Sequence, residues 1–162
     1  MGRSVNAQGD SELEPGFSIQ KANWHDLNQV WALEKLCFSK EDAWPYLDLL
    51  GALSFPGLVR FKLSEGQKVI GFVGGEIKEG RGWITTIEVH PEYQGKGFGR
   101  ALLAKAEEAL ATHSIRLTTR KSNMEAIRLY EKNGYKAIGL WPGYYIGGED
   151  GLVFEKIFED KS

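Results

Sequence analysis

The chain has 162 residues, of which 42% are hydrophobic and 26% charged, a balance typical of one globular domain with its own core. Its net charge of −2 gives no general attraction to nucleic acid, and no apolar run reaches the roughly 18 residues of a membrane helix. We therefore expect no nucleic-acid or membrane partner. The single cysteine excludes an intrachain disulfide, so we expect a cytoplasmic protein.

The first half of the chain predicts a tail, a strand, two helices and a hairpin. Residues 1–16 are rich in Ser, Gly, Asn and acids and are expected to form a flexible tail. The alternating stretch 17–20 predicts a short strand, and Asn23 with Asp26 predicts a capped helix start. Next we expect a short helix within residues 39–53, and then a hairpin. Its strands are residues 58–63 and 68–77, the second with glycines that allow a bulge.

Two residues of the first helix, Glu34 and Cys37, could carry chemistry. The apolar positions of this helix are Leu27, Val30, Trp31, Cys37 and Phe38. Glu34 lies on this stripe, and a carboxylate that faces a core is costly unless it is paired or lines a wet cleft. Either an edge position with a structural ion pair or a functional carboxylate accounts for it. Cys37 is expected to be a buried structural thiol rather than a nucleophile.

The most informative stretch is residues 89–100, with the sequence VHPEYQGKGFGR. Gly97 and Gly99 leave backbone N–H groups open to a ligand at the start of a helix, where the dipole is positive. Lys96 and Arg100 add full positive charges, so the stretch predicts a pyrophosphate site. It is not a P-loop, because no Ser or Thr follows the lysine, and its glycine spacing is not that of a dinucleotide-binding turn.

The second half predicts a parallel strand pair and a final antiparallel pair. The strand at residues 83–89 leads into the glycine-rich turn, and a helix follows to about residue 113. The next strand, 115–119, is expected to run parallel to 83–89 through a right-handed crossover. A capping box at Ser122–Glu125 opens a further helix, which ends at a left-handed Asn133–Gly134. The last strands are residues 135–140 and 152–156, on either side of a loop.

Two motifs give the chain a family resemblance. Gln94, Gly97 and Gly99 match the Gln/Arg-x-x-Gly-x-Gly/Ala motif of the GNAT superfamily of acyl-CoA-dependent N-acetyltransferases. A second stretch resembles the next GNAT motif at the usual distance, through Asn123, Ala126, Leu129, Tyr130 and Asn133–Tyr135. The segments RKSN at residues 120–123, GYY at 143–145 and EDG at 149–151 resemble the N-terminal protein acetyltransferases, including bacterial enzymes that modify ribosomal proteins. Glu34 and Phe38, followed by Trp44–Pro45, are similar to the first helix and loop of that bacterial group.

The resemblance covers roughly residues 17–157 and implies a mixed α/β GNAT fold within a single domain, residues 17–158. That fold has a central mixed, largely antiparallel sheet with a splayed parallel strand pair and flanking helices. Acetyl-CoA would enter the wedge between the splayed strands as co-substrate, with no metal. The implied cofactor-binding residues are Ile87, Val89, Gln94, Gly95, Lys96, Gly97, Phe98, Gly99, Arg100, Asn123, Arg128 and Tyr130, with Arg120 and Lys121 as further cations for the phosphates.

The resemblance also implies the catalytic groups. Tyr130 matches the family tyrosine that protonates the departing thiolate, and a backbone N–H near Val89 would stabilise the oxyanion. The positions where the family places a base hold Thr118 and Trp83, and neither side chain accepts a proton at neutral pH. Glu34 and Glu88 are therefore our candidates for the base, and the further candidates are Glu41 and His90. The residues expected to flank the acceptor are Tyr144 and Tyr145.

The lack of a base at the usual positions favours an acceptor of low pKa. An α-amine with a pKa of about 7.7–8.0 is roughly 10–17% neutral at pH 7, whereas a lysine amine is roughly 0.04% neutral. We therefore expect acetyl transfer to a protein or peptide N-terminus, by a monomer or a homodimer. The alternatives are a small-molecule amine, a lysine side chain, a non-catalytic acyl-CoA-binding regulator and a nucleotide-binding module.

Overall fold

A single seven-stranded sheet organises residues 13–159, the part of the chain described in this computed structural model. The strand order is β1-β2-β3-β4-β5-β7-β6, and β4 and β5 are the parallel pair among otherwise antiparallel neighbours. The expected mixed sheet with one parallel pair is therefore confirmed. The strands are β1 (Phe17–Lys21), β2 (Val59–Glu65), β3 (Lys68–Lys78), β4 (Arg81–Val89), β5 (Ser114–Arg120), β6 (Lys136–Trp141) and β7 (Gly151–Ile157).

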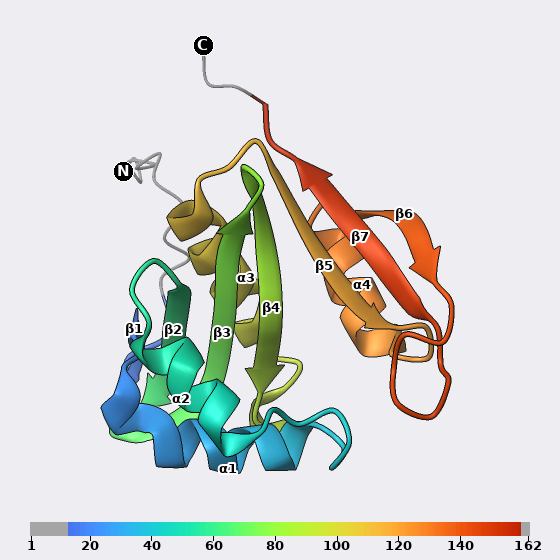
Figure 1. Ribbon diagram of the computed structural model, residues 1–162. Helices are drawn as coiled ribbons and strands as arrows, with labels where there is room; N and C mark the ends of the chain where they lie inside the picture. The colour runs from blue at the N-terminus through green and yellow to red at the C-terminus, as the bar shows by residue number, and fades with distance from the viewer. Residues whose placement is uncertain (1–12, 160–162) are drawn as a thin grey trace.

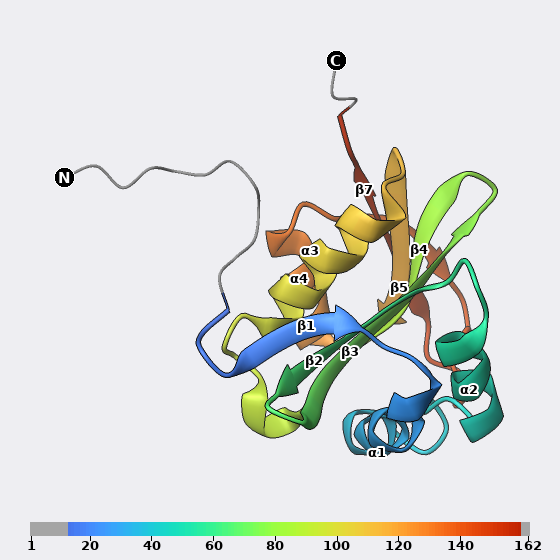
Figure 2. The same ribbon diagram turned by 90° about the vertical axis from the view of Figure 1, so that its left-hand side faces the viewer.

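Helices cover both faces of the sheet, with α1 and α2 on one face and α3 and α4 on the other (Figures 1 and 2). Two apolar clusters fill these layers: one holds buried side chains of α3, α4 and the strands, and the other those of α1, α2 and β3. The helices are η1 (Trp24–Asp26), α1 (Leu27–Cys37), α2 (Tyr46–Ser54), η2 (Pro91–Tyr93), α3 (Phe98–Leu110) and α4 (Met124–Lys132), where η marks a 3₁₀ helix.

The parallel pair is joined at one end only. β4 and β5 pair at Gly82 with Ile115 and at Trp83 with Arg116, and beyond that point the strands diverge toward their C-terminal ends (Figure 1). A side chain does not fit at Gly82, because a Cβ there would lie 2.7 Å from Thr112 Oγ1 and 2.9 Å from Ile115 Cγ1. The close approach at Gly82 and the open wedge below it set the position of the functional site.

Three helix ends can be compared with the ends predicted from the sequence. The capping box of Asn23 and Asp26 is confirmed, although it opens the 3₁₀ turn η1 and α1 follows directly. The predicted capping box at Ser122 is wrong: Asn123 is the N-cap of α4, since its side chain accepts from the Ala126 N–H at 3.1 Å. The helix expected to reach residue 113 ends at Leu110, because Ala111 adopts a left-handed conformation (φ 47°).

The expected flexible tail, residues 1–16, lies outside the described residues except for its last four. Leu13 packs against the larger apolar cluster, and the Gly16 carbonyl accepts from the Gly66 N–H at 3.0 Å. Cys37 is half-buried, and its thiol donates to the Val89 carbonyl at 3.4 Å. Within residues 13–159, no helix is both long enough and apolar enough to cross a membrane.

Candidate active site

The glycine-rich turn between β4 and α3 has the backbone geometry that only glycine adopts readily. Gly95 has a φ of 75°, and Gly97, the N-cap of α3, has a φ of 84°. No helical partner exists for the first N–H groups of α3, which follow directly at Phe98 and its neighbours. The turn therefore directs backbone donors and the positive end of the α3 dipole toward one point, as an anion site requires.

Gly99 lines the cavity described next, and it also has a packing role that the sequence does not predict. A Cβ at Gly99 would lie 3.2 Å from the Leu129 side chain, so the glycine allows α3 and α4 to approach each other closely.

A cavity of about 560 Å³ lies beside this turn, between α3 and α4. It brings together nearly all the side chains predicted to bind the cofactor: Ile87, Val89, Gln94, Gly95, Gly97, Phe98, Gly99, Arg100, Asn123, Arg128 and Tyr130. Lys96 is not among the lining residues, and its ammonium lies 5.4 Å from the centre of the Tyr93 ring. We call this space the cofactor cavity.

The edge of β4 that faces the wedge carries backbone groups that have no partner in β3 or β5. The His90 N–H donates to the Ile70 carbonyl at 2.7 Å, on the β3 side. Hydrogen-bonded and non-bonded pairs alternate along an antiparallel ladder, so the N–H and carbonyl of Val89, and likewise of Ile87, point away from β3 toward β5. The Gln94 side chain accordingly reaches the Val89 carbonyl from that side, at 3.0 Å. This edge suits a ligand rich in amide groups.

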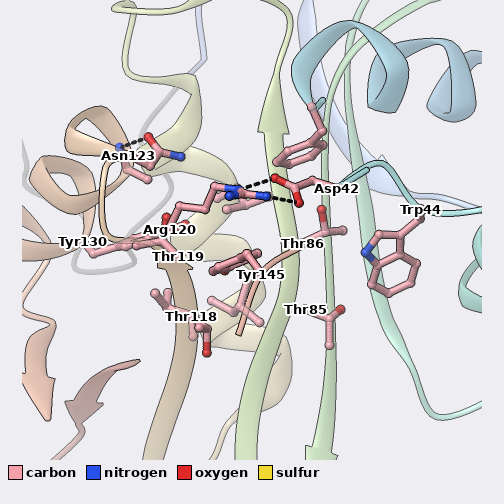
Figure 3. Close-up of a pocket in the computed structure, with 15 residues that line it drawn as sticks. Asp42, Trp44, Thr85, Thr86, Thr118, Thr119, Arg120, Asn123, Tyr130 and Tyr145 are labelled. Carbon is pink, nitrogen blue, oxygen red and sulfur yellow. Dashed lines mark hydrogen bonds and ion pairs between the residues drawn. The ribbon is translucent and has the colours of Figure 1, made fainter. Parts of the chain in front are cut away.

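A second cavity, of about 180 Å³, lies between β4 and β5 where the strands diverge (Figure 3). Its walls come from both strands, from the α1–α2 loop (residues 38–45) and from the β6–β7 loop (residues 142–150). We call it the acceptor cavity. The residues that line both cavities are Phe38, Ile87, Asn123, Ala126 and Tyr130. The two spaces therefore meet around Tyr130.

Tyr130 stands at this junction on the buried face of α4. It is 5% exposed, and its ring packs at 6.1 Å from the Tyr135 ring and 5.9 Å from the Phe154 ring. Burial raises the pKa of the Tyr130 hydroxyl above its ordinary value of about 10. The phenol therefore stays protonated across the neutral range, which a general acid requires.

The two candidate bases form a buried carboxyl pair. Glu88 lines the cofactor cavity, whereas Glu34 lines neither cavity and contacts the acceptor cavity only through Trp44 and Thr86. Glu34 is fully buried, and it accepts from the Trp44 backbone N–H at 3.3 Å and from the Thr86 hydroxyl at 3.4 Å. Glu88 is 4% exposed, and among the described residues its carboxyl oxygens have no hydrogen-bond partner of regular geometry. Glu34 thus faces inward on its stripe with hydrogen bonds rather than an ion pair.

Burial raises the pKa of both carboxyls, and the neighbouring Glu34 charge raises that of Glu88 further. For Glu34 the Trp44 and Thr86 hydrogen bonds oppose the shift, so Glu34 ionises first and Glu88 holds its proton to higher pH. Burial and the two carboxylates also raise the pKa of the Cys37 thiol to about 12, which keeps it unreactive.

Only some of the remaining predicted residues line the acceptor cavity. Thr118 lines the acceptor cavity, whereas Trp83 stacks on Trp141 in an adjoining hollow, with ring centres 6.2 Å apart. Tyr145 lines the acceptor cavity, and Tyr144 lines the adjoining hollow. Glu41 and His90 line neither the acceptor cavity nor the cofactor cavity. Within the described chain no three His, Cys, Asp or Glu side chains are placed to hold a metal ion.

Arg120 corrects one expectation. It does not face the cofactor cavity but lines the acceptor cavity, where its guanidinium binds the Asp42 and Glu149 carboxylates. Lys121 lines neither of the two cavities.

Three further residues at the site are not predicted from the sequence: Asp42, Trp44 as a donor to Glu34, and Thr86. Asp42 and Trp44 lie in an irregular loop without periodicity. Thr86 is an ordinary strand residue by sequence, and only the inward position of Glu34 gives a reason to look for its donors.

The family model for the Acetyltransferase (GNAT) family matches residues 24–135, more than half of the chain. This chain belongs to the GNAT family of acetyltransferases. Among its relatives is an N-alpha-acetyltransferase of Saccharolobus solfataricus, 27% identical over 86% of this chain and 92% of the relative.

Solved GNAT structures share the fold. The ribosomal-protein-S18-alanine N-acetyltransferase of Escherichia coli matches with a TM-score of 0.78 at 23% identity, over 90% of this chain and 98% of that one. NAA60 of Arabidopsis thaliana, solved with acetyl-CoA, matches with a TM-score of 0.79 at 17% identity, over 88% of this chain and 99% of that one. The GNAT fold expected from the sequence is confirmed.

Proposed function

We propose that this GNAT acetyltransferase transfers the acetyl group of acetyl-CoA directly to the α-amine of a protein or peptide N-terminus. The observation that carries the proposal is the meeting of the cofactor cavity and the acceptor cavity at Tyr130. The names of the relatives support the acceptor class, since several are N-alpha-acetyltransferases. The proposed catalytic unit is the domain of residues 17–158 in one chain, as a monomer or as each half of a homodimer, in the cytoplasm.

The residues of the cofactor cavity suit two parts of acetyl-CoA, the pyrophosphate and the pantetheine arm. The N–H groups at the start of α3, with Arg100 and Arg128 beside them, would hold the pyrophosphate. The Ile87–Val89 edge would pair with the amides of the pantetheine arm, which brings the thioester to the end of β4. The Val89 N–H would then donate to the oxyanion.

The chemistry needs one acid and one base, and the site offers both. The amine nitrogen attacks the thioester carbon, a C–N bond forms, the C–S bond breaks, and Tyr130 gives its proton to the departing sulfur. The proton lost by the amine passes through the Thr86 hydroxyl to the Glu34 carboxylate, because Thr86 lines the acceptor cavity and contacts Glu34. Glu34 then releases its proton to solvent, and solvent returns a proton to Tyr130. A carboxylate of raised pKa is a stronger base than an exposed one, and an α-amine demands less of it than lysine does.

The test is free-thiol release from acetyl-CoA with peptides of varied first residue, each paired with an N-terminally blocked copy that contains lysine. We expect activity on free N-termini alone. Activity on the blocked copies would point to lysine, and activity only on small amines such as polyamines would replace the proposed acceptor class.

Two isosteric variants test the base. Glu34→Gln should lower turnover by roughly 10²-fold or more, because the proton acceptor is lost. Glu88→Gln is the matched control: it resembles the protonated Glu88 of the native pair, so turnover should stay within about threefold. Equal losses in both variants would contradict the assignment of Glu34 as the base.

A further inference from the structure

The guanidinium of Arg120, the last residue of β5, ties together two loops that are distant in sequence. Figure 3 shows its pair with Asp42. Its Nε and Nη2 bind the two Asp42 oxygens at 2.5 Å and 2.6 Å, in the α1–α2 loop. Its Nη1 binds Glu149 Oε1 at 3.1 Å, and Nη2 also reaches the Ile146 carbonyl at 3.2 Å, both in the β6–β7 loop. We call Asp42, Arg120 and Glu149 the acceptor-loop clamp.

The Glu149 end of the clamp is held by further contacts. Glu149 Oε1 accepts from the Ser122 hydroxyl at 2.9 Å, and Glu149 Oε2 accepts from the Ser122 N–H at 3.2 Å. The Tyr145 N–H donates to the Glu149 carbonyl at 3.1 Å, and the Tyr145 ring lies 4.7 Å from the guanidinium carbon. The β6–β7 loop is therefore fixed to β5 by both charge and aromatic stacking.

The clamp borders the place where the acceptor must bind. Asp42, Arg120 and Tyr145 all line the acceptor cavity, with Trp44 on the wall opposite Tyr145 (Figure 3). The clamp side chains are only 17–28% exposed, so water screens these ion pairs less than fully exposed ones. A bidentate arginine–carboxylate pair also fixes orientation, which a lysine in its place does not.

Loop order has a direct effect on binding. If the two loops were free in the unliganded protein, acceptor binding would have to order them, which lowers affinity by their conformational entropy. An ion pair that fixes both loops beforehand removes that cost from the binding step. The same contacts have no part in the bond changes at the thioester.

We propose that Arg120 is a positioning residue that holds the two acceptor loops in their binding arrangement, and so sets the affinity for the acceptor. The proposal rests on the proposed function of the site. Its consequence is a separation of kinetic effects: loss of the clamp raises KM for the acceptor and leaves the chemical step and acetyl-CoA binding intact.

The experiment compares Arg120→Gln and Asp42→Asn with the wild-type chain. Arg120→Gln should raise the acceptor KM roughly tenfold, since a charged hydrogen-bond partner is lost at both loops. Its kcat at saturating acceptor and its KM for acetyl-CoA should change less than about twofold. When Arg120→Gln and Asp42→Asn are combined, the rise in the acceptor KM should stay near that of Arg120→Gln alone, because the two side chains act as one unit. Hydrogen exchange of the free protein should speed up in residues 142–150 and 38–45.

Lys156→Gln is the matched control. It removes an ion pair of similar burial, Lys156 to Glu107 at 3.1 Å, far from the acceptor loops, and should lower stability without changing the acceptor KM. An unchanged acceptor KM in Arg120→Gln, or unchanged exchange in both loops, overturns the clamp. A fall in kcat with KM unchanged also overturns it.

Failure of the proposed function gives a different result, because the wild-type chain would then acetylate no free peptide N-terminus. In that case the KM is measured with whichever amine it does acetylate, and with no active amine the exchange rates alone decide.

Discussion

Single residues at the junction of the two cavities carry the proposed chemistry, and Tyr130 is the clearest of them. Its ring is buried among Tyr135 and Phe154, while its position on α4 borders both cavities. Burial keeps the phenol protonated, so the proton is available when a thiolate departs.

We predict that Tyr130→Phe lowers turnover by roughly 10²–10⁴-fold and barely changes CoA affinity, because only the acidic proton is removed. Steady-state kinetics and a CoA binding titration measure the two quantities. Tyr135→Phe is the control: its hydroxyl binds Glu107 at 3.0 Å, so the change should cost about 1 kcal/mol of stability and leave turnover intact. Wild-type turnover in Tyr130→Phe would remove this tyrosine from the mechanism.

The buried Glu88 makes a prediction about pH. The pKa of Glu88 is raised in the folded state, so its effect on stability is absent below the unfolded pKa and grows unfavourable as pH rises toward the folded pKa. Above about pH 4.3, wild type should therefore lose stability relative to Glu88→Gln by up to about 1.4 kcal/mol per pH unit. Urea unfolding of both proteins from pH 4 to pH 8 measures this difference. Parallel stability curves would show that Glu88 is not perturbed.

At the scale of elements, the sheet depends on the narrow junction of β4 and β5. Gly82 lets β4 approach Ile115 and Thr112, and its N–H donates to the Thr112 hydroxyl at 3.1 Å. This contact fixes the end from which the wedge opens.

Gly82→Ala should lower the free energy of unfolding by about 1–3 kcal/mol, because the added methyl group overlaps atoms that cannot all move. Chemical denaturation measures the loss. Gly139→Ala in β6 is the control, since a Cβ there meets no atom within 4 Å, and it should be close to neutral. A stable Gly82→Ala variant would mean that the strands separate without cost at this point.

Elements whose signals are local were predicted well from the sequence. The glycine-rich turn and the capping box at Asn23 depend on residues within a few positions of one another, and the parallel pair follows from the strand–helix–strand order of one continuous segment. The errors came from partners far along the chain. Ser122 loses its capping role because its hydroxyl donates to Glu149, 27 residues later, and Arg120 turns away from the cofactor to bind Asp42, 78 residues earlier. No local pattern records such pairs.

At the scale of the whole molecule, the two halves of the sheet meet across the wedge, and the proposed co-substrate would contact both. Binding to the folded state alone stabilises it, by about 2.7 kcal/mol at a ligand concentration one hundred times Kd. For a chain of this size, acetyl-CoA should then raise Tm by about 5–11 °C. Differential scanning calorimetry with increasing acetyl-CoA measures the shift. A Tm that stays constant up to millimolar acetyl-CoA would contradict the assignment of the cofactor cavity.

Because β4 and β5 are joined at one end only, the fold also has a consequence for the order in which the substrates bind. Pantetheine between the diverging strands would act as an extra strand, and its acyl end would form the floor on which an acceptor rests. An acceptor that binds before acetyl-CoA would lack this part of its binding site. Turnover should therefore follow a sequential order in which acetyl-CoA binds first and CoA is the last product to leave. Dead-end CoA analogues should accordingly inhibit competitively against acetyl-CoA and noncompetitively against the acceptor.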